Sequence, residues 1–290
     1  MTSDPKPEVH ALLHAGTSTI CYIVACPTTR QCAVIDAVLD FDLASGRTAT
    51  TFAERVVAKV RELGLTVQWV LETHVHADHL SGAPAVRAAL GGRVGIGDHI
   101  GEVQAGFAKI YNLEPEFRTD GSQFDHLFTD GEQFAIGQMP AKAMHTPGHT
   151  PACMTYRIGD AVFCGDTIFM PDFGTARCDF PGGSAETLYR SIQRILALPP
   201  ETRIFVGHDY GPDGREIAWE TTVAEQRKSN KHVHDGVDEA QFVAMRTKRD
   251  AELAMPGLLL PSIQVNIRAG EMPPAEDNGV SYLKLPLNRF

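Results

Sequence analysis

Residues 72–79 read Glu-Thr-His-Val-His-Ala-Asp-His. Four of these side chains can bind a metal ion, namely His74, His76, Asp78 and His79. Residues two apart on an α-helix point about 200° away from each other, so a helix could not aim all four at one point. A loop could, and the apolar residues 67–71 just before it are typical of a short buried strand. The pattern therefore predicts a metal-binding loop at the end of a strand.

Three more candidate ligands follow, each directly after a short apolar strand. They are His149 in Thr146-Pro147-Gly148-His149-Thr150, Asp166 in Cys164-Gly165-Asp166-Thr167, and His208 in Val206-Gly207-His208-Asp209-Tyr210. Side chains at strand ends on one sheet edge can converge although they are far apart in sequence. Imidazole and carboxylate ligands together suit Zn, Fe or Mn, and the lack of cysteine among them argues against a structural zinc site.

The rest of the chain alternates between expected strands and helices, which indicates an α/β protein. Strands are expected at 18–24, 33–37, 67–71, 93–96, 133–136, 142–144, 154–158, 161–163 and 203–206. Helices are expected at 52–63, at 83–90 with Ser81 as its cap, at 186–198, at 224–228 and at 240–254. The tail from Pro256 is rich in Pro, Asn and Gly, and we expect it to wrap the body as an extended segment.

Composition excludes several classes of protein. A chain of 290 residues is long enough for one large core, so it needs neither disulfides nor metals to fold. The net charge of −10 argues against binding to nucleic acid, which favours basic proteins. No apolar stretch approaches the roughly 20 residues of a membrane helix, and the start of the chain does not resemble a secretory signal. The six cysteines form no CxxC pair, so we expect reduced thiols and a cytoplasmic protein.

The HxHxDH loop and the three later ligands resemble the metallo-β-lactamase superfamily in order and context. This resemblance implies an αββα four-layer sandwich with the metal at the sheet edge. We expect a catalytic domain at 1–229 and a helical and extended C-terminal segment at 230–290 that packs on it. In two-metal members of the superfamily, the equivalents of His74, His76 and His149 hold one ion. The equivalents of Asp78, His79 and His208 hold the other, and that of Asp166 bridges the two.

Two branches of the superfamily fit, and both act on derivatives of glutathione. In the hydroxyacylglutathione hydrolases (glyoxalase II), two metal ions activate a water molecule that attacks a thioester. In the persulfide dioxygenases, a single Fe(II) is held by the equivalents of His74, His149 and Asp166. Two histidines and one carboxylate are the ligands expected of a non-haem iron oxygenase. In that branch the remaining four candidates either orient the ligands and water or hold a second metal; these are His76, Asp78, His79 and His208.

Three stretches resemble the persulfide dioxygenases more closely. Residues 170–183 contain Arg177-Cys178-Asp179-Phe180, which places Arg177 where that family has an arginine near the glutathione site. The turn at 207–210 has His-Asp-Tyr, where glyoxalase II tends to have His-Glu-Tyr. The tail, at 265–270 and 282–288, resembles a longer bacterial branch called β-lactamase hydrolase-like. The helical glutathione-binding domain of glyoxalase II cannot be traced in this chain.

These observations predict a dioxygenase that oxidises glutathione persulfide with O2 to sulfite and glutathione. We expect one Fe(II) per chain, with Zn(II) as a substitute or as the metal of the hydrolase alternative. Arg177 and Tyr210 are predicted to contact the substrate; the alternatives are an ion pair of Arg177 with Asp179 or Asp172, and simple packing of Tyr210. Packing is the expected role of Cys178, with redox sensitivity as the alternative. We expect neither nucleic-acid nor membrane partners, and a homo-oligomer that is a dimer or a tetramer.

Overall fold

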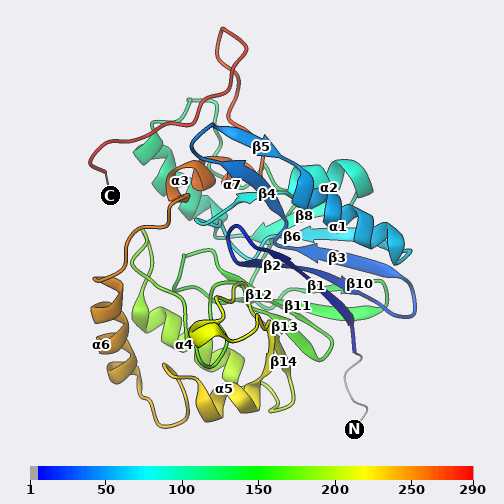
Figure 1. The fold of residues 1–290 in the computed structure, drawn as a ribbon, viewed down its shortest axis with the longest axis vertical. Coiled ribbons are helices and arrows are strands. Elements are labelled where there is room, and N and C mark those ends of the chain that lie inside the picture. Colours follow the sequence, from blue (N-terminus) through cyan, green and yellow to red (C-terminus); the bar gives the residue numbers. More distant parts are fainter. Residues whose placement is uncertain (1–5, 290) are drawn as a thin grey trace.

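The computed structural model describes residues 6–289, which form two six-stranded β-sheets packed face to face with helices outside them (Figure 1). The first sheet has the order β1 (Glu8–His14), β2 (Thr19–Ala25), β3 (Gln31–Ile35), β6 (Thr66–Leu71), β8 (Arg93–Gly97) and β9 (His126–Phe128). The second has the order β10 (Gln133–Ile136), β11 (Met139–His145), β12 (Met154–Ile158), β13 (Ala161–Phe163), β14 (Arg203–Phe205) and β15 (Glu220–Thr222). A small third sheet joins β5 (Arg47–Ala49), β4 (Val38–Asp42) and β7 (Leu80–Ser81).

The helices cover the outer faces of these sheets. Those near the first sheet are α1 (Thr51–Glu62), α2 (Ala83–Leu90), α3 (Ile100–Tyr111) and α7 (Leu259–Asn266). Those near the second sheet are α4 (Ala185–Leu196), α5 (Val223–Ser229) and α6 (Glu239–Asp250), and a short 3-10 turn lies at Pro212–Gly214. This order of helix, sheet, sheet and helix confirms the predicted four-layer sandwich.

Strand β2 shows how the sequence builds the two apolar layers. All seven of its residues are buried. Ile20, Tyr22 and Val24 point into the core between the two sheets. The alternate residues point to the layer beneath α1, α2, α3 and α7; they are Cys21, Ile23 and Ala25. A strand that is covered on both faces is apolar throughout, whereas a strand with one wet face alternates.

Three local expectations were wrong. Helix α3 is absent from the expected helices, although its residues Val103, Phe107 and Tyr111 are buried at helical spacing. An extended tail is expected after Pro256, but α7 is helical; Pro261 lies in its first turn, where proline is tolerated. The N-cap position of α2 is Gly82 rather than Ser81, although the Ser81 hydroxyl still accepts the N–H of Ala83, the first residue of the helix, while it donates to Glu72.

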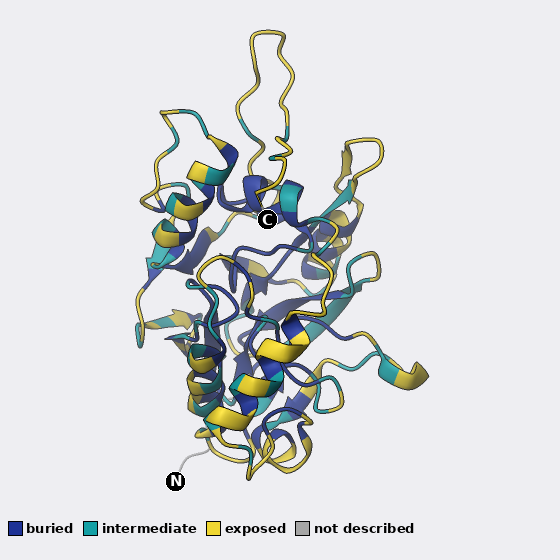
Figure 2. Cartoon of the chain, turned by 90° about the vertical axis from the view of Figure 1, so that its left-hand side faces the viewer, coloured by how far each residue is buried: buried dark blue, intermediate teal, exposed yellow. Residues whose placement is uncertain are grey.

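The C-terminal segment lies against both halves of the sandwich. Helix α6 packs on α4, with the rings of Tyr189 and Phe242 5.6 Å apart and an ion pair of 2.7 Å between Arg190 and Glu239. Helix α7 lies against β7 and α3. Beyond α7 the chain projects from the body as an exposed loop (Figure 2). The boundary at residue 229 stays a prediction.

All six cysteines are buried and free, as expected for reduced thiols. Within residues 6–289, no helix combines the length and the apolar character needed to cross a bilayer. The cytoplasmic location and the oligomeric state stay predictions.

Candidate metal centre

The seven predicted ligands all follow strand ends that meet at one edge of the two sheets. His74, His76, Asp78 and His79 lie in the loop between β6 and β7. His149 follows β11, Asp166 follows β13, and His208 follows β14. Gly165 permits this convergence, because its φ is +47° and a Cβ there would lie 2.3 Å from the hydroxyl of Thr73 in the β6–β7 loop. Only glycine allows so close an approach of the two loops.

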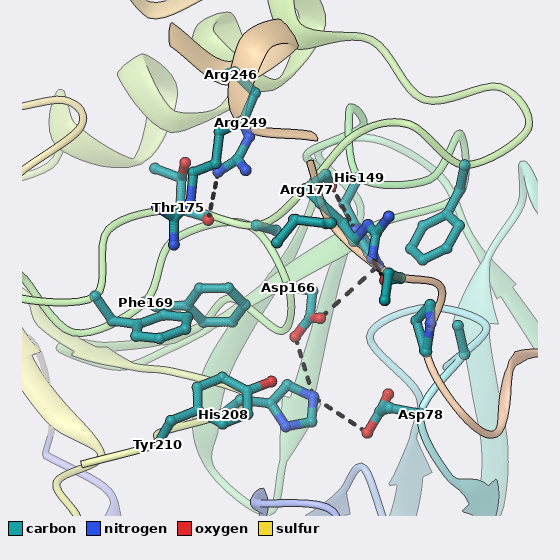
Figure 3. Close-up of a pocket in the computed structure, with 17 residues that line it drawn as sticks. Asp78, His149, Asp166, Phe169, Thr175, Arg177, His208, Tyr210, Arg246 and Arg249 are labelled. Atoms are coloured by element: carbon teal, nitrogen blue, oxygen red, sulfur yellow. Dashed lines mark hydrogen bonds and ion pairs between the residues drawn. The ribbon is translucent and has the colours of Figure 1, made fainter. Parts of the chain in front are cut away.

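His74, His149 and Asp166 form one group of ligand atoms at this edge that could hold a metal ion. One ligand atom from each lies within 4.8 Å of those of the other two. His149 Nε2 is 3.8 Å from Asp166 Oδ2 (Figure 3). The Nδ1–H of His149 donates to the carbonyl of Arg177 at 2.8 Å, which leaves the Nε2 lone pair facing the carboxylate. A hydrogen bond of this kind fixes the tautomer that a metal requires.

The tautomer of His74 is fixed in the same way. Its Nδ1 lies 3.0 Å from the hydroxyl of Thr73, and that hydroxyl donates to Asp36 at 2.8 Å. The hydroxyl therefore accepts from Nδ1–H, and Nε2 carries the lone pair. Burial, followed by the charges of His76 and His149, holds the pKa of His74 well below its usual value. His74 is therefore a neutral imidazole at pH 7, which is the form that binds metals.

Buried atoms without partners show that a metal ion fits these residues. Among the described residues, His74 Nε2 and Asp166 Oδ1 have no hydrogen-bond partner. Buried polar atoms are rarely left unpaired, because each costs about 1–3 kcal/mol. Two free imidazole nitrogens and a carboxylate are ligands that Fe(II), Mn(II) or Zn(II) would accept.

The other four predicted ligands lie beside this group. His208 Nε2 is 3.4 Å from Asp166 Oδ1 and 3.5 Å from Asp78 Oδ2. His79 Nδ1 is 3.0 Å from Asp78 Oδ2, while its Nε2 is buried without a partner in the described chain. Burial, with the nearby His76, lowers the pKa of His79 to about 4. The structure thus brings all seven candidates together, and their positions are compatible with one metal ion or with two.

His76 is held differently from His74. Its Nε2 lies 3.0 Å from Asp36 and 3.4 Å from Glu72, and all three side chains are buried. Burial alone would lower the pKa of His76, but the two carboxylates outweigh it and raise the pKa well above 6.5. His76 is therefore drawn to an acidic pair behind the site in the metal-free protein, whereas His74 is left as a free base.

A cavity of about 300 Å³ opens over these ligands (Figure 3). Its inner end is formed by Asp78, His149, Asp166 and His208. Its walls are aromatic and include Phe169, Phe173, Phe180 and Tyr210. Three arginines also line it: Arg246 and Arg249 of α6 lie at the outer end, away from Asp78 and His208, whereas Arg177 lies beside His149 (Figure 3). The cavity therefore joins the metal-binding residues to the α6 arginines.

The three arginines differ in how their charges are used. Arg177 donates to both oxygens of Asp179 at 2.6 Å and to the carbonyl of Ala254 at 2.7 Å. The ion pair with Asp179, named above as the alternative, is thus present, and substrate contact by Arg177 stays a prediction. Arg246 is buried and pairs with Asp250. Arg249 is exposed, and its guanidinium makes no hydrogen bond or ion pair with any residue from 6 to 289.

Two further residues named from the sequence also have defined surroundings. The ring of Tyr210 lies 4.7 Å from that of Phe173 and nearly parallel to that of His208, and it is about half exposed in the cavity wall. Cys178 is buried with its thiol 3.3 Å from Asp250, and burial, with Asp250, raises its pKa to about 12. Its environment is that of a packed, un-ionised thiol.

Sequence reasoning missed Arg246, Arg249 and Asp36 as parts of this region. The two arginines lie on α6, about 70 residues after Arg177, in a run of charges that resembles any solvated helix face. The only indication of Asp36 in the sequence is that an acidic residue directly follows an apolar strand. It has a φ of +54°, in the left-handed region, and it also accepts a hydrogen bond from the backbone N–H of Thr73.

A family model described as the metallo-beta-lactamase superfamily matches residues 16–208. The chain belongs to this superfamily. It is 53% identical to a "Probable metallo-hydrolase" of Burkholderia pseudomallei, over 97% of this chain and 99% of that protein. It is also 53% identical to "Glyoxylase B2" of Dictyostelium discoideum, over 99% of each chain. A "Beta-lactamase hydrolase-like protein" of Xylella fastidiosa is 53% identical over 97% of this chain, which spans 65% of that longer protein.

More distant members of the superfamily are persulfide dioxygenases. The mitochondrial persulfide dioxygenase ETHE1 of Bos taurus is 30% identical over 89% of this chain and 87% of its own length. The crystal structure of ETHE1 from Myxococcus xanthus superposes with a TM-score of 0.72 at 28% identity, and the match covers 91% of this chain and all of that one. These likenesses confirm the predicted resemblance to the persulfide dioxygenases and to the β-lactamase hydrolase-like branch.

Proposed function

We propose that this protein is a persulfide dioxygenase with glutathione persulfide as its substrate. Glutathione persulfide, O2 and water would give glutathione and sulfite, with the terminal sulfur oxidised and O2 reduced. The observation that carries the proposal is the group of His74, His149 and Asp166, two of which, His149 and Asp166, line a cavity that also holds the unpaired guanidinium of Arg249. The similarity to persulfide dioxygenases over most of the chain supports it.

His74, His149 and Asp166 would hold Fe(II) in this proposal. Bound there by only three protein ligands, Fe(II) would supply open coordination positions and the redox chemistry with O2 that zinc lacks. The protein's own contribution is to keep both imidazoles as free bases. Thr73 does so for His74, and the Arg177 carbonyl does so for His149.

The cavity would orient the substrate by charge and by shape. Glutathione carries two carboxylates remote from its sulfur, and a persulfide must point its sulfur toward the metal ligands. Arg249 is free to bind a carboxylate at the outer end, because its charge is not neutralised by any neighbour in residues 6–289. Phe169, Phe173 and Phe180 would shield the segment between the two ends from water.

Thioester hydrolysis at a two-metal site is the second candidate. The observation that favours it is that Asp78, His79 and His208 are also brought to the edge, so a second set of ligands is complete. The likeness to "Glyoxylase B2" supports the same alternative.

The test is O2 uptake by protein loaded anaerobically with Fe(II) and then given glutathione persulfide, with sulfite measured alongside. We expect uptake and sulfite in equal amounts, and neither from zinc-loaded protein. Lactoylglutathione is given to the same preparations as the competing substrate. Full O2 uptake with zinc alone, or hydrolysis of lactoylglutathione without any O2 uptake, would overturn the proposal; the second result would favour the hydrolase.

A further inference from the structure

Asn266, at the end of the C-terminal helix α7, reaches into the metal-binding loop. It is 4% exposed. Its Nδ2 donates to the carbonyl of His76 and to that of His79, both at 2.8 Å. Its Oδ1 accepts the backbone N–H of Ser81 at 2.8 Å. One side chain thus ties together three backbone groups of the loop, from a position 185 to 190 residues further along the chain.

We propose that Asn266 is a positioning residue of the metal centre, and that the C-terminal segment is therefore part of that centre. Residues 72–79 contain no helix, and the strand that follows them, β7, has only two residues. The loop therefore has little regular backbone pairing to hold it. The two hydrogen bonds from Asn266 hold the backbone carbonyls of His76 and His79 in place. Asp78 lies between these two residues, so its side-chain direction is held as well.

The anchor of Asn266 is itself rigid. Helix α7 buries Ile263 and Ile267 in the layer beside the first sheet. The carbonyl of Ile267, next to Asn266, accepts a hydrogen bond from the buried amide of Gln104 on α3 at 2.9 Å. Because the helix is held by the protein core, the side chain of Asn266 holds the loop at a defined position relative to that core.

The hydrogen-bonding pattern requires an amide at this position. An aspartate would keep an acceptor for Ser81, but it has no N–H for the carbonyls of His76 and His79 and would place negative charge against them. An alanine would leave all three backbone groups buried without the partner that they have now. The inference concerns binding of the metal and holds for either reaction discussed above.

Gln264 offers a matched control on the same helix. It is also buried, and its side-chain amide also makes three hydrogen bonds. One goes to the carbonyl of Leu260 within the helix, and the two to the carbonyl and N–H of Lys284 tie the helix to the tail rather than to the metal loop. Gln264→Ala therefore removes a comparable buried amide without touching the loop.

The experiment measures Zn(II) and Co(II) affinity by competition with a chelator, together with the unfolding of the metal-free proteins and the Co(II) absorption spectrum. We expect Asn266→Ala and Gln264→Ala to destabilise the metal-free protein, but only Asn266→Ala to weaken metal binding, by about 10- to 100-fold, and to alter the Co(II) spectrum. If Asn266→Ala does not fold, Asn266→Asp, which keeps the side-chain shape, is measured instead.

Equal metal affinities and unchanged Co(II) spectra in the Asn266 and Gln264 variants would overturn the proposal and leave Asn266 with a purely structural role. Because the readout is metal binding rather than turnover, failure here is distinct from failure of the proposed dioxygenase activity.

Discussion

The metal end of the cavity and the C-terminal contacts behind it are both buried and polar, yet they differ in how their polar atoms are paired. At the metal end, His74 Nε2, His79 Nε2 and Asp166 Oδ1 have no hydrogen-bond partner among residues 6–289. Behind it, Asn266 has paired donors and a paired acceptor. Unpaired buried atoms are costly and persist where a ligand completes them. Paired atoms hold the geometry in place.

Among the substitutions considered, removal of the Asp166 carboxylate should weaken metal binding the most. Asp166→Ala should weaken metal binding more than about 100-fold, because loss of a mere supporting group costs about 10- to 100-fold. The metal retained after dialysis against a chelator measures it. Asp172→Ala is the control, since Asp172 is in the loop that follows and pairs with Arg215. If the Asp166 variant keeps its metal as well as the control does, the unpaired carboxylate is not a ligand.

A change at the supporting hydroxyl of Thr73 should have a smaller effect. Thr73→Val keeps the shape of the side chain but breaks the link from His74 Nδ1 to Asp36. We expect metal affinity to fall by about 10- to 100-fold, as for other groups that orient a metal ligand. Thr222→Val, which removes the hydroxyl that accepts the Glu225 N–H at the start of α5, a helix that carries none of the ligands, should leave metal affinity unchanged.

His232, a buried histidine that accepts a hydrogen bond as a neutral base, should make the stability of the protein depend on pH. His232 Nδ1 accepts from the backbone N–H of Thr175 at 3.0 Å, and burial, with Arg246 and Lys231, lowers its pKa to about 3. The unfolded chain, with a pKa near 6.5, takes up this proton first. The stabilisation is therefore full above pH 6.5 and is lost as the pH falls toward 3.

His232→Asn keeps an acceptor but does not titrate. Between pH 6.5 and 5, the free energy of unfolding of the unsubstituted protein should fall by up to about 2 kcal/mol more than that of the variant. Urea unfolding of the metal-free proteins at each pH measures this difference. Parallel pH profiles for the two proteins would show that His232 carries no such linkage.

The smallest effect is expected at the outer end of the cavity. Arg249→Ala should raise the KM for glutathione persulfide by about fivefold with kcat unchanged, since an exposed ion pair contributes up to about 1 kcal/mol. High salt should reduce the difference. Lys248→Ala, next to it on α6, is the control. An equal KM for both variants would assign carboxylate recognition to another group.

The parts of the fold and site that could be predicted are those encoded locally. The loop at 72–79 and the turns before His149, Asp166 and His208 each follow an apolar strand, and strand ends on one sheet edge converge. Asn266 and Arg249 carry no such local signal, because their roles arise from how α7 and α6 pack on the sandwich. Helix α7 itself was hidden by Pro256 and Pro261, which flank the apolar residues between them.

Under the proposed function, the raised pKa of five buried thiols has a consequence, because the substrate is a persulfide. A persulfide passes its outer sulfur to thiolates, and the thiolate rather than the thiol is the acceptor. Burial raises the pKa of Cys32, Cys153, Cys164 and Cys178 to about 12, and that of Cys21 is raised as well. These side chains stay protonated at neutral pH and out of contact with solvent. Cys26 is the exception, because hydrogen bonds from Thr29 outweigh burial and lower the pKa of its thiol to about 7. Under the proposed function, the other five thiols would therefore resist sulfuration, and Cys26 would be the thiol most open to it.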